Sequence, residues 1–101
     1  MSSYHWEFSS RALKQAKRLD VQVNKRITKW LDYHIEGTSD PRKWGKALEG
    51  NMNTFWRYRV GKYRLIANIV DDKFIVEVIK VKKEMIYIQT NKLRKERLYG
   101  F

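Results

Sequence analysis

The segment from Thr54 to Leu65, TFWRYRVGKYRL, constrains the fold of this chain more than any other. Two runs rich in β-forming residues flank Gly61 and Lys62, and a two-residue connection that contains glycine is the strongest short-range signal for a β-hairpin. A turn at these two residues places Arg59 directly opposite Arg64. The hairpin therefore fixes the register of two strands from local sequence alone.

Side chains alternate between the two faces of a strand, so Arg57, Arg59 and Arg64 share one face of this hairpin. Trp56 and Tyr58 point to the other face, where we expect them to pack in the core. Like charges directly opposite each other destabilise a sheet, and the hairpin contains no acid to offset them. Guanidinium groups bind phosphate through paired hydrogen bonds. The three arginines thus predict an anion site, and the alternative is a solvated sheet face.

A second hairpin is predicted between residues 63–70 and 73–82, with its turn at Asp71 and Asp72, a pair that favours turns. Placing Val70 opposite Lys73 puts seven apolar residues on one face, which should receive the helices. These residues are Tyr63, Leu65, Ala67, Ile69, Phe74, Val76 and Val78.

The same register defines the opposite, open face of the sheet. It collects Arg57, Arg59, Arg64, Ile66, Ile75, Glu77 and Ile79, and Lys83 joins them if the alternation continues. Glu77 is either a structural counterion of Arg57 or, less simply, a catalytic group.

Upstream of the hairpins, residues 4–8 predict a short strand, and Ser9 or Ser10 is a suitable N-cap for a helix over residues 11–19. A second helix follows Asp20 and ends before Gly37. Its apolar stripe comprises Val23, Ile27, Trp30, Leu31, His34 and Ile35, so His34 is expected to pack rather than to bind a ligand. Residues 38–53 predict a loop with one helical turn around Trp44. The resulting fold class is α+β: a small antiparallel sheet of about four strands with two N-terminal helices packed on one face.

The length of 101 residues predicts a single domain over residues 1–101. Its 22 Lys and Arg against 11 Asp and Glu give a formal charge of +11, which implies a polyanionic partner. Cysteine is absent and only two histidines occur, so we expect neither a metal nor another cofactor. No apolar run reaches the roughly 20 residues that span a bilayer, and residues 1–8 do not resemble a signal peptide. A cytoplasmic protein without membrane contact is expected.

Several segments together resemble the RelE/ParE superfamily of bacterial toxins, and specifically its RelE branch. They are FSSRALKQAKRL, PRKWGKALEGN, FWRYRVGKYRLIANI and VEVIKVKKEMIY, which cover nearly the whole chain. The resemblance implies the toxin of a type II toxin–antitoxin system, a metal-independent endoribonuclease that cuts mRNA in the ribosomal A site. It implies three partners, the ribosome, mRNA and a cognate antitoxin. The alternatives are a ParE-like inhibitor of DNA gyrase without nuclease activity, and a noncatalytic RNA-binding module.

The resemblance also assigns roles to individual residues. Arg57 and Arg59 match the basic residues that bind substrate, and Arg64 matches the arginine at the scissile phosphate. Lys83 is aligned with a later arginine and is the candidate general acid, although Glu84 is an alternative match for that position. Tyr87 matches a tyrosine that stacks on a base or orients the 2′-hydroxyl. The catalytic set expected is therefore Arg64, Lys83 and Tyr87, with Arg57 and Arg59 as substrate-binding residues and no assigned general base.

Overall fold

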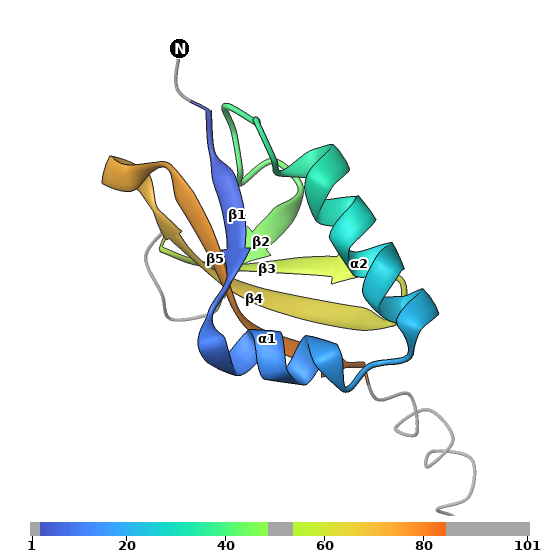
Figure 1. Ribbon diagram of the computed structural model, residues 1–101. Coiled ribbons are helices and arrows are strands. Elements are labelled where there is room, and N and C mark those ends of the chain that lie inside the picture. Colours follow the sequence, from blue (N-terminus) through green and yellow to red (C-terminus); the bar gives the residue numbers. More distant parts are fainter. Residues whose placement is uncertain (1–2, 49–53, 85–101) are drawn as a thin grey trace, which may run out of the picture.

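The computed structural model describes residues 3–48 and 54–84 (Figure 1). In chain order the elements are β1 (His5–Phe8), α1 (Ser10–Lys17), α2 (Val21–His34), β2 (Gly45–Ala47), β3 (Phe55–Val60), β4 (Tyr63–Val70), the short 3-10 turn η1 (Asp71–Lys73) and β5 (Ile75–Lys83). Within these ranges neither α-helix is long and apolar enough to cross a bilayer.

The strands form one five-stranded sheet in the order β1-β5-β4-β3-β2. Strand β1 pairs with β5 in parallel, and the other neighbouring strands are antiparallel. The α+β class is confirmed, with one strand more than predicted and one parallel pairing. The additional strand is β2, which follows a turn at residues 41–44 in the region where the sequence predicts only a loop.

Both helices contribute to one hydrophobic core on a single face of the sheet, as predicted (Figure 1). Its buried members include Ala12 of α1, Ile27 and Leu31 of α2, and the strand residues Tyr58, Val60, Leu65, Ala67, Ile69, Val76, Val78 and Val81. The strand members alternate with residues that point to the other face, because successive side chains of a strand point in opposite directions. The two helices therefore leave the opposite face of the sheet uncovered.

Local signals account for both helices. Ser9 caps α1, and its Oγ accepts a hydrogen bond from the backbone N–H of Ala12 at 3.1 Å. Asp20 precedes α2 without a side-chain capping bond. The chain then turns at Gly37, whose φ of 79° lies in the left-handed region that glycine favours. His34 packs between the rings of Trp30 and Trp44, at 4.6 and 4.5 Å, as a packing residue should.

The first hairpin has the predicted register. Val60 pairs with Tyr63, Arg59 with Arg64, and Tyr58 with Leu65, around a turn in which Gly61 has a φ of 61°.

The second hairpin has a different register from the predicted one. Its connection is longer, because η1 is followed by Phe74 in the left-handed conformation with a φ of 55°. Val70 consequently pairs with Ile75 rather than with Lys73. Phe74 is exposed in this connection instead of joining the core.

A β-bulge shifts the register once more in the middle of β5. Ala67 pairs with Val78 while the adjacent Ile66 pairs with Lys80, so that Ile79 is the extra residue. Beyond a bulge of one residue the alternation of faces is reversed. Val81 therefore turns into the core, where it is 8% exposed. Lys83 pairs with Tyr63. The prediction that Lys83 shares a face with Arg64 is thus wrong.

Candidate nucleic-acid interface

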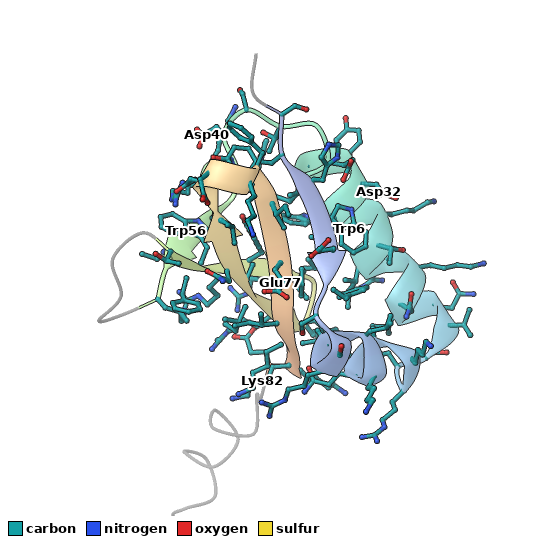
Figure 2. The ribbon with its side chains drawn as sticks, turned by 60° about the vertical axis from the view of Figure 1, so that its left-hand side comes forward. Trp6, Asp32, Asp40, Trp56, Glu77 and Lys82 are labelled. Carbon is teal, nitrogen blue, oxygen red and sulfur yellow. The ribbon has the colours of Figure 1, made fainter. Side chains whose placement is uncertain are left out.

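The face of the sheet away from the helices carries two rows of cations that cross the strands. In the first row Lys46 of β2 pairs with Arg57 of β3, and Ile66 of β4 pairs with Lys80 of β5. In the second row Arg59, Arg64 and Lys82 follow one another across β3, β4 and β5. Figure 2 shows Lys82 towards the C-terminal end of β5 and Glu77 nearer its middle. We refer to Lys46, Arg57, Arg59, Arg64, Lys80 and Lys82 as the cationic face.

Three pairs of like charges are direct cross-strand neighbours on this face: Lys46 with Arg57, Arg59 with Arg64, and Arg64 with Lys82. Such pairs destabilise a sheet by roughly 0.2–1 kcal/mol each. The repulsion is relieved when a polyanion lies across the strands and places its negative charges between the rows. The register of the sheet therefore gathers positive charge on this face, where a negative group between the rows offsets the repulsion.

Two hollows open on the cationic face, and Arg57 and Arg64 line both of them. The larger has a volume of about 520 Å³. Its lining combines the cations Arg11, Arg57, Arg64, Lys80 and Lys82 with Ser9 and the apolar Leu48, Ile66 and Ile79. The smaller, of about 210 Å³, is lined by Trp44, Gly45, Lys46, Arg57, Arg59 and Arg64. Apolar surface beside guanidinium groups suits a base and its phosphate, and two such hollows joined at two arginines suit consecutive nucleotides of a single strand.

An acid lies among these cations, contrary to the expectation from the hairpin alone. Arg59 donates from Nη2 to both carboxylate oxygens of Glu84, at 2.5 Å each, and Arg64 Nη2 lies 3.8 Å from Glu84 Oε2. The hydrogen bond from Arg59 is the main reason that the pKa of Glu84 lies below the usual value for a glutamate. Glu77 pairs with Asn68, whereas Arg57 pairs with Ile66, so Glu77 is not the cross-strand counterion of Arg57.

Three of the five predicted site residues are brought together: Arg57, Arg59 and Arg64. Lys83 is not on their face, and Tyr87 lies outside the described residues. Sequence reasoning missed Lys46, Lys80 and Lys82. Lys46 was missed because the sequence predicts a loop where the structure has β2. For Lys80 and Lys82, the signal is the run VEVIKVK over residues 76–82. Its core valines Val76 and Val78 are two residues apart, whereas Val81 follows three residues after Val78. That break in the period of two marks the bulge.

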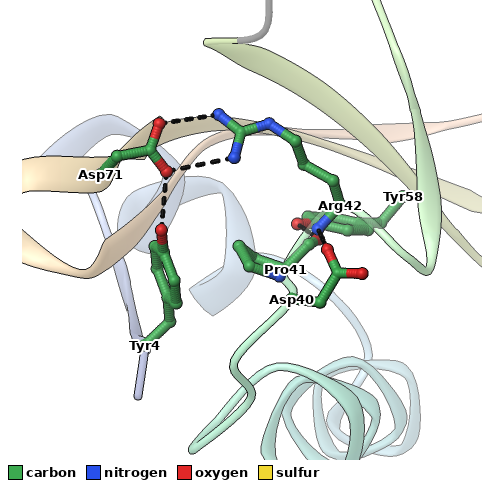
Figure 3. Close-up of polar contacts among 6 residues, drawn as sticks. All are labelled: Tyr4, Asp40, Pro41, Arg42, Tyr58 and Asp71. Carbon is green, nitrogen blue, oxygen red and sulfur yellow. Dashed lines mark hydrogen bonds and ion pairs between the residues drawn. The ribbon is translucent and has the colours of Figure 1, made fainter. Parts of the chain in front are cut away.

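A polar clamp holds the loop that leads into β2 against the rest of the fold (Figure 3). Arg42 donates to both carboxylate oxygens of Asp71, at 3.1 and 3.0 Å, and the hydroxyl of Tyr4 donates to the same carboxylate at 2.7 Å. The hydroxyl of Tyr58 donates to the carbonyl of Pro41, and burial raises the pKa of that hydroxyl. The clamp joins the residue before β1, the β4–β5 connection and the loop that leads into β2, where Lys46 pairs with Arg57.

Fold and site together define a small basic α+β protein in which one face of the sheet carries aligned cations. The model of the family described as "ParE toxin of type II toxin-antitoxin system, parDE" matches residues 6–85. This chain belongs to that toxin family, which confirms the resemblance seen in its sequence.

Individual relatives point to the RelE branch. The chain is 32% identical over 82 residues to the mRNA interferase toxin RelE of Escherichia coli K12, which covers 80% of this chain and 83% of the relative. The crystal structure of the isolated E. coli RelE toxin superimposes with a TM-score of 0.72 at 27% identity, covering 93% of this chain and 99% of that one. A chain of the intact E. coli RelBE toxin–antitoxin complex gives a TM-score of 0.67 at 29% identity, with 83% of this chain and 100% of that chain covered.

Proposed function

We propose that this protein is the toxin of a type II toxin–antitoxin system and that it inhibits translation by cutting mRNA on the ribosome. The observation that carries the proposal is the pair of hollows whose linings share Arg57 and Arg64. In the proposal, consecutive nucleotides of a single strand lie in the two hollows and a phosphate lies at their junction. The 32% identity to proteins named mRNA interferases supports it. The site of action is then the cytoplasm, where ribosomes translate.

The chemistry assigned to the face is electrostatic. Cleavage of RNA through its own 2′-hydroxyl requires removal of that proton, stabilisation of the charge on the pentavalent phosphorus, and protonation of the leaving 5′-oxygen. Arg57 and Arg64, at the junction of the hollows, hold the scissile phosphate and its developing charge. Arg59 holds a neighbouring phosphate. No metal is required by this scheme.

The general acid is assigned to Lys82 rather than to Lys83. Lys82 is the cross-strand neighbour of Arg64 and lines the larger hollow. The ammonium group of a lysine carries protons that it can donate to an oxygen, as a general acid must. Tyr87 retains its predicted place in the reaction, as a residue that stacks on a base or orients the 2′-hydroxyl.

A cognate antitoxin is the partner that controls this activity. The toxin of the solved E. coli RelBE complex has the same fold, and the formal charge of +11 favours a partner with acidic segments. Such a partner would cover part of the cationic face and so compete with RNA.

The test is induction of the protein in bacterial cells, followed by mapping of mRNA 5′ ends and separate labelling of protein and DNA synthesis. New 5′ ends within translated codons and an early arrest of protein synthesis are expected, and Arg64→Ala should show neither. The ParE name of the matching family keeps gyrase inhibition as the second candidate. An early arrest of DNA synthesis with intact mRNA, together with inhibited supercoiling by purified gyrase, would replace the first proposal by the second.

A further inference from the structure

Within residues 3–48 and 54–84, Glu84 is the acidic residue whose side chain contacts the cationic face. Its contacts are with Arg59 and Arg64. It directly follows β5, and its backbone N–H donates to the carbonyl of Lys62 at 2.7 Å, so the main chain is fixed at the turn of the first hairpin. This turn is two residues from both Arg59 and Arg64. The glutamate is therefore held beside the two arginines by its backbone as well as by its side chain.

The carboxylate of Glu84 makes the contacts that a phosphate would make at this position. Both of its oxygens accept from Arg59, and one lies 3.8 Å from a guanidinium nitrogen of Arg64. Carboxylate and phosphate present oxygens to guanidinium groups in similar ways, and arginine binds both through the same donors. Arg59 and Arg64 are direct cross-strand neighbours, so one bound anion relieves their mutual repulsion.

The ion pair is also open to exchange. The side chain of Arg59 is 67% exposed and that of Arg64 is 39% exposed. Ion pairs at such exposed positions contribute little net stability, because water and salt screen them. An RNA phosphodiester carries the same single negative charge as a carboxylate and also offers two oxygens to the guanidinium groups, so it can exchange with Glu84 at this place.

We propose that Arg59 and Arg64 form a phosphate subsite next to the junction of the two hollows, and that Glu84 occupies it as an internal competitor until an RNA phosphate displaces it. The proposal rests on the proposed function for the identity of the anion as an RNA phosphate. It makes Glu84 a residue that sets RNA affinity: the resting protein binds RNA less tightly than its arginines alone would allow.

The test measures binding of a fluorescein-labelled 2′-O-methyl hexaribonucleotide, which cannot be cleaved through its 2′-oxygen, by anisotropy at several salt concentrations. Glu84→Gln should bind about tenfold more tightly than the parent. The slope of log Kd against log salt should steepen by about 0.7, the increment for one more phosphate contact on a single strand. Glu84→Asp, with a shorter reach to the arginines, should fall between the two.

Glu77→Gln is the matched control, because it removes the same charge from a position within β5 that, among the described residues, forms no ion pair with Arg59 or Arg64. It should leave the affinity nearly unchanged. The double variant Arg59→Ala with Glu84→Gln should bind no more tightly than Arg59→Ala alone, since the competitor acts through Arg59. Equal tightening in Glu77→Gln and Glu84→Gln would reduce the effect to net charge and overturn the proposal, as would an unchanged affinity in folded Glu84→Gln and Glu84→Asp.

This assay is independent of cleavage. Tighter binding by Glu84→Gln without mRNA cleavage in cells would leave the subsite standing and reject the proposed function. If the protein cleaves mRNA in cells but its RNA affinity is unchanged in Glu84→Gln, the proposed function stands and the subsite is rejected.

Discussion

Arg64 occupies the most connected position on the cationic face. It is the cross-strand neighbour of both Arg59 and Lys82, and it lines both hollows. A guanidinium at this point can stabilise the negative charge that develops on a phosphate during the reaction. Its own contribution to folding is small, because its side chain is partly exposed and its contact with Glu84 is long.

We therefore expect Arg64→Ala to lower mRNA cleavage about 10²-fold to 10³-fold, the effect of removing one donor at a developing charge, and to leave the fold intact. Leu65→Ala is the matched control from the same strand, because Leu65 is fully buried. It should lower the free energy of unfolding by about 2–5 kcal/mol. Cleavage on programmed ribosomes and urea denaturation measure the two effects. An Arg64→Ala protein that cleaves normally would remove this residue from the site.

Lys82 and Lys83 allow a direct comparison between adjacent lysines on opposite faces of one strand. Lys82→Ala should lower single-turnover cleavage about 10²-fold, the usual scale for a general acid, and Lys82→Arg should retain part of the activity. Lys83→Ala should have a much smaller effect, since its position pairs with Tyr63 rather than with Arg64. A larger loss in Lys83→Ala than in Lys82→Ala would contradict the assignment.

The difference between these lysines also separates what the sequence can and cannot predict about the site. Arg57, Arg59 and Arg64 were predicted correctly as one cluster because a two-residue turn fixes their register locally. The position of Lys82 depends on a longer connection at η1 and on a bulge at Ile79, and each of them shifts the register of β5. The ion pair of Arg59 with Glu84 depends on the same shifts, so it could not be predicted from the first hairpin.

Strand β2 is the element that completes the cationic face, and Gly45 is what allows it to pair. A Cβ on Gly45 would lie 2.3 Å from the carbonyl oxygen of Arg57 and 2.8 Å from Cδ1 of Trp56. Neither the backbone of β3 nor a half-buried indole can easily yield by that amount. Strand β2 would have to separate from β3 and carry Lys46 with it.

Gly45→Ala should therefore lower the free energy of unfolding by about 1–3 kcal/mol, as overpacking does, and should also weaken RNA binding. Gly37→Ala is the comparison, because Gly37 is far from the face and a Cβ there meets nothing within 4 Å. That variant should lose about 1–2 kcal/mol from its left-handed backbone alone, with RNA binding unchanged. Urea denaturation and anisotropy on the same samples measure both quantities. Unchanged RNA binding by Gly45→Ala would separate β2 from the site.

The clamp at Asp71 predicts how stability depends on pH. Hydrogen bonds from Arg42 and Tyr4 lower the pKa of Asp71 below its ordinary value of about 3.9. A carboxyl with a lowered folded-state pKa contributes stability above its unfolded pKa, and this contribution is lost as the pH falls through the folded value. The side chain of Asp71 is 55% exposed, so solvent screening limits the effect to about 1 kcal/mol or less.

Asp71→Asn should consequently be less stable than the parent at pH 7 and should lose less stability between pH 5 and pH 2. Asp72→Asn, which removes the same charge from the same turn, should follow the parent. Urea denaturation across this pH range measures the difference. Some pH dependence should remain in Asp71→Asn, because His5 lowers the pKa of Glu36 as well. Identical curves for Asp71→Asn and the parent would show that the clamp does not stabilise the fold.

At the level of elements, the sequence predicts those structures whose signals are local. The capping serine, the apolar stripe of α2 and the glycine in the first turn each act within a few residues, and both helices and the hairpin were predicted correctly. Two features have no local signal. The three-residue strand β2 is defined by its pairing with β3, and β1 pairs in parallel with β5, about 70 residues later in the chain. Such pairings depend on the whole fold.

The positive charge of the whole molecule bears on how partners approach the cationic face. The chain carries a formal charge of +11, and the six residues of the cationic face lie across four strands of one sheet surface. A concentrated field of one sign steers an oppositely charged partner towards the surface that it will contact, which raises the association rate. RNA and an acidic antitoxin would be steered to the same face.

The salt dependence of antitoxin binding tests this at the scale of the molecule. The association rate with the cognate antitoxin should fall at least about tenfold between 50 and 500 mM salt, whereas the dissociation rate should change much less. Replacing Lys80 and Lys82 by glutamate should reduce both the rate at low salt and its dependence on salt. Replacing Lys14 and Lys17 of α1 by glutamate changes the net charge equally at exposed positions outside the linings of both hollows, and it should have the smaller effect. Stopped-flow mixing measures both rates for each variant. An association rate that does not depend on salt would mean that apolar contacts, rather than the cationic face, guide the antitoxin. Equal effects from the two double variants would mean that net charge alone guides it.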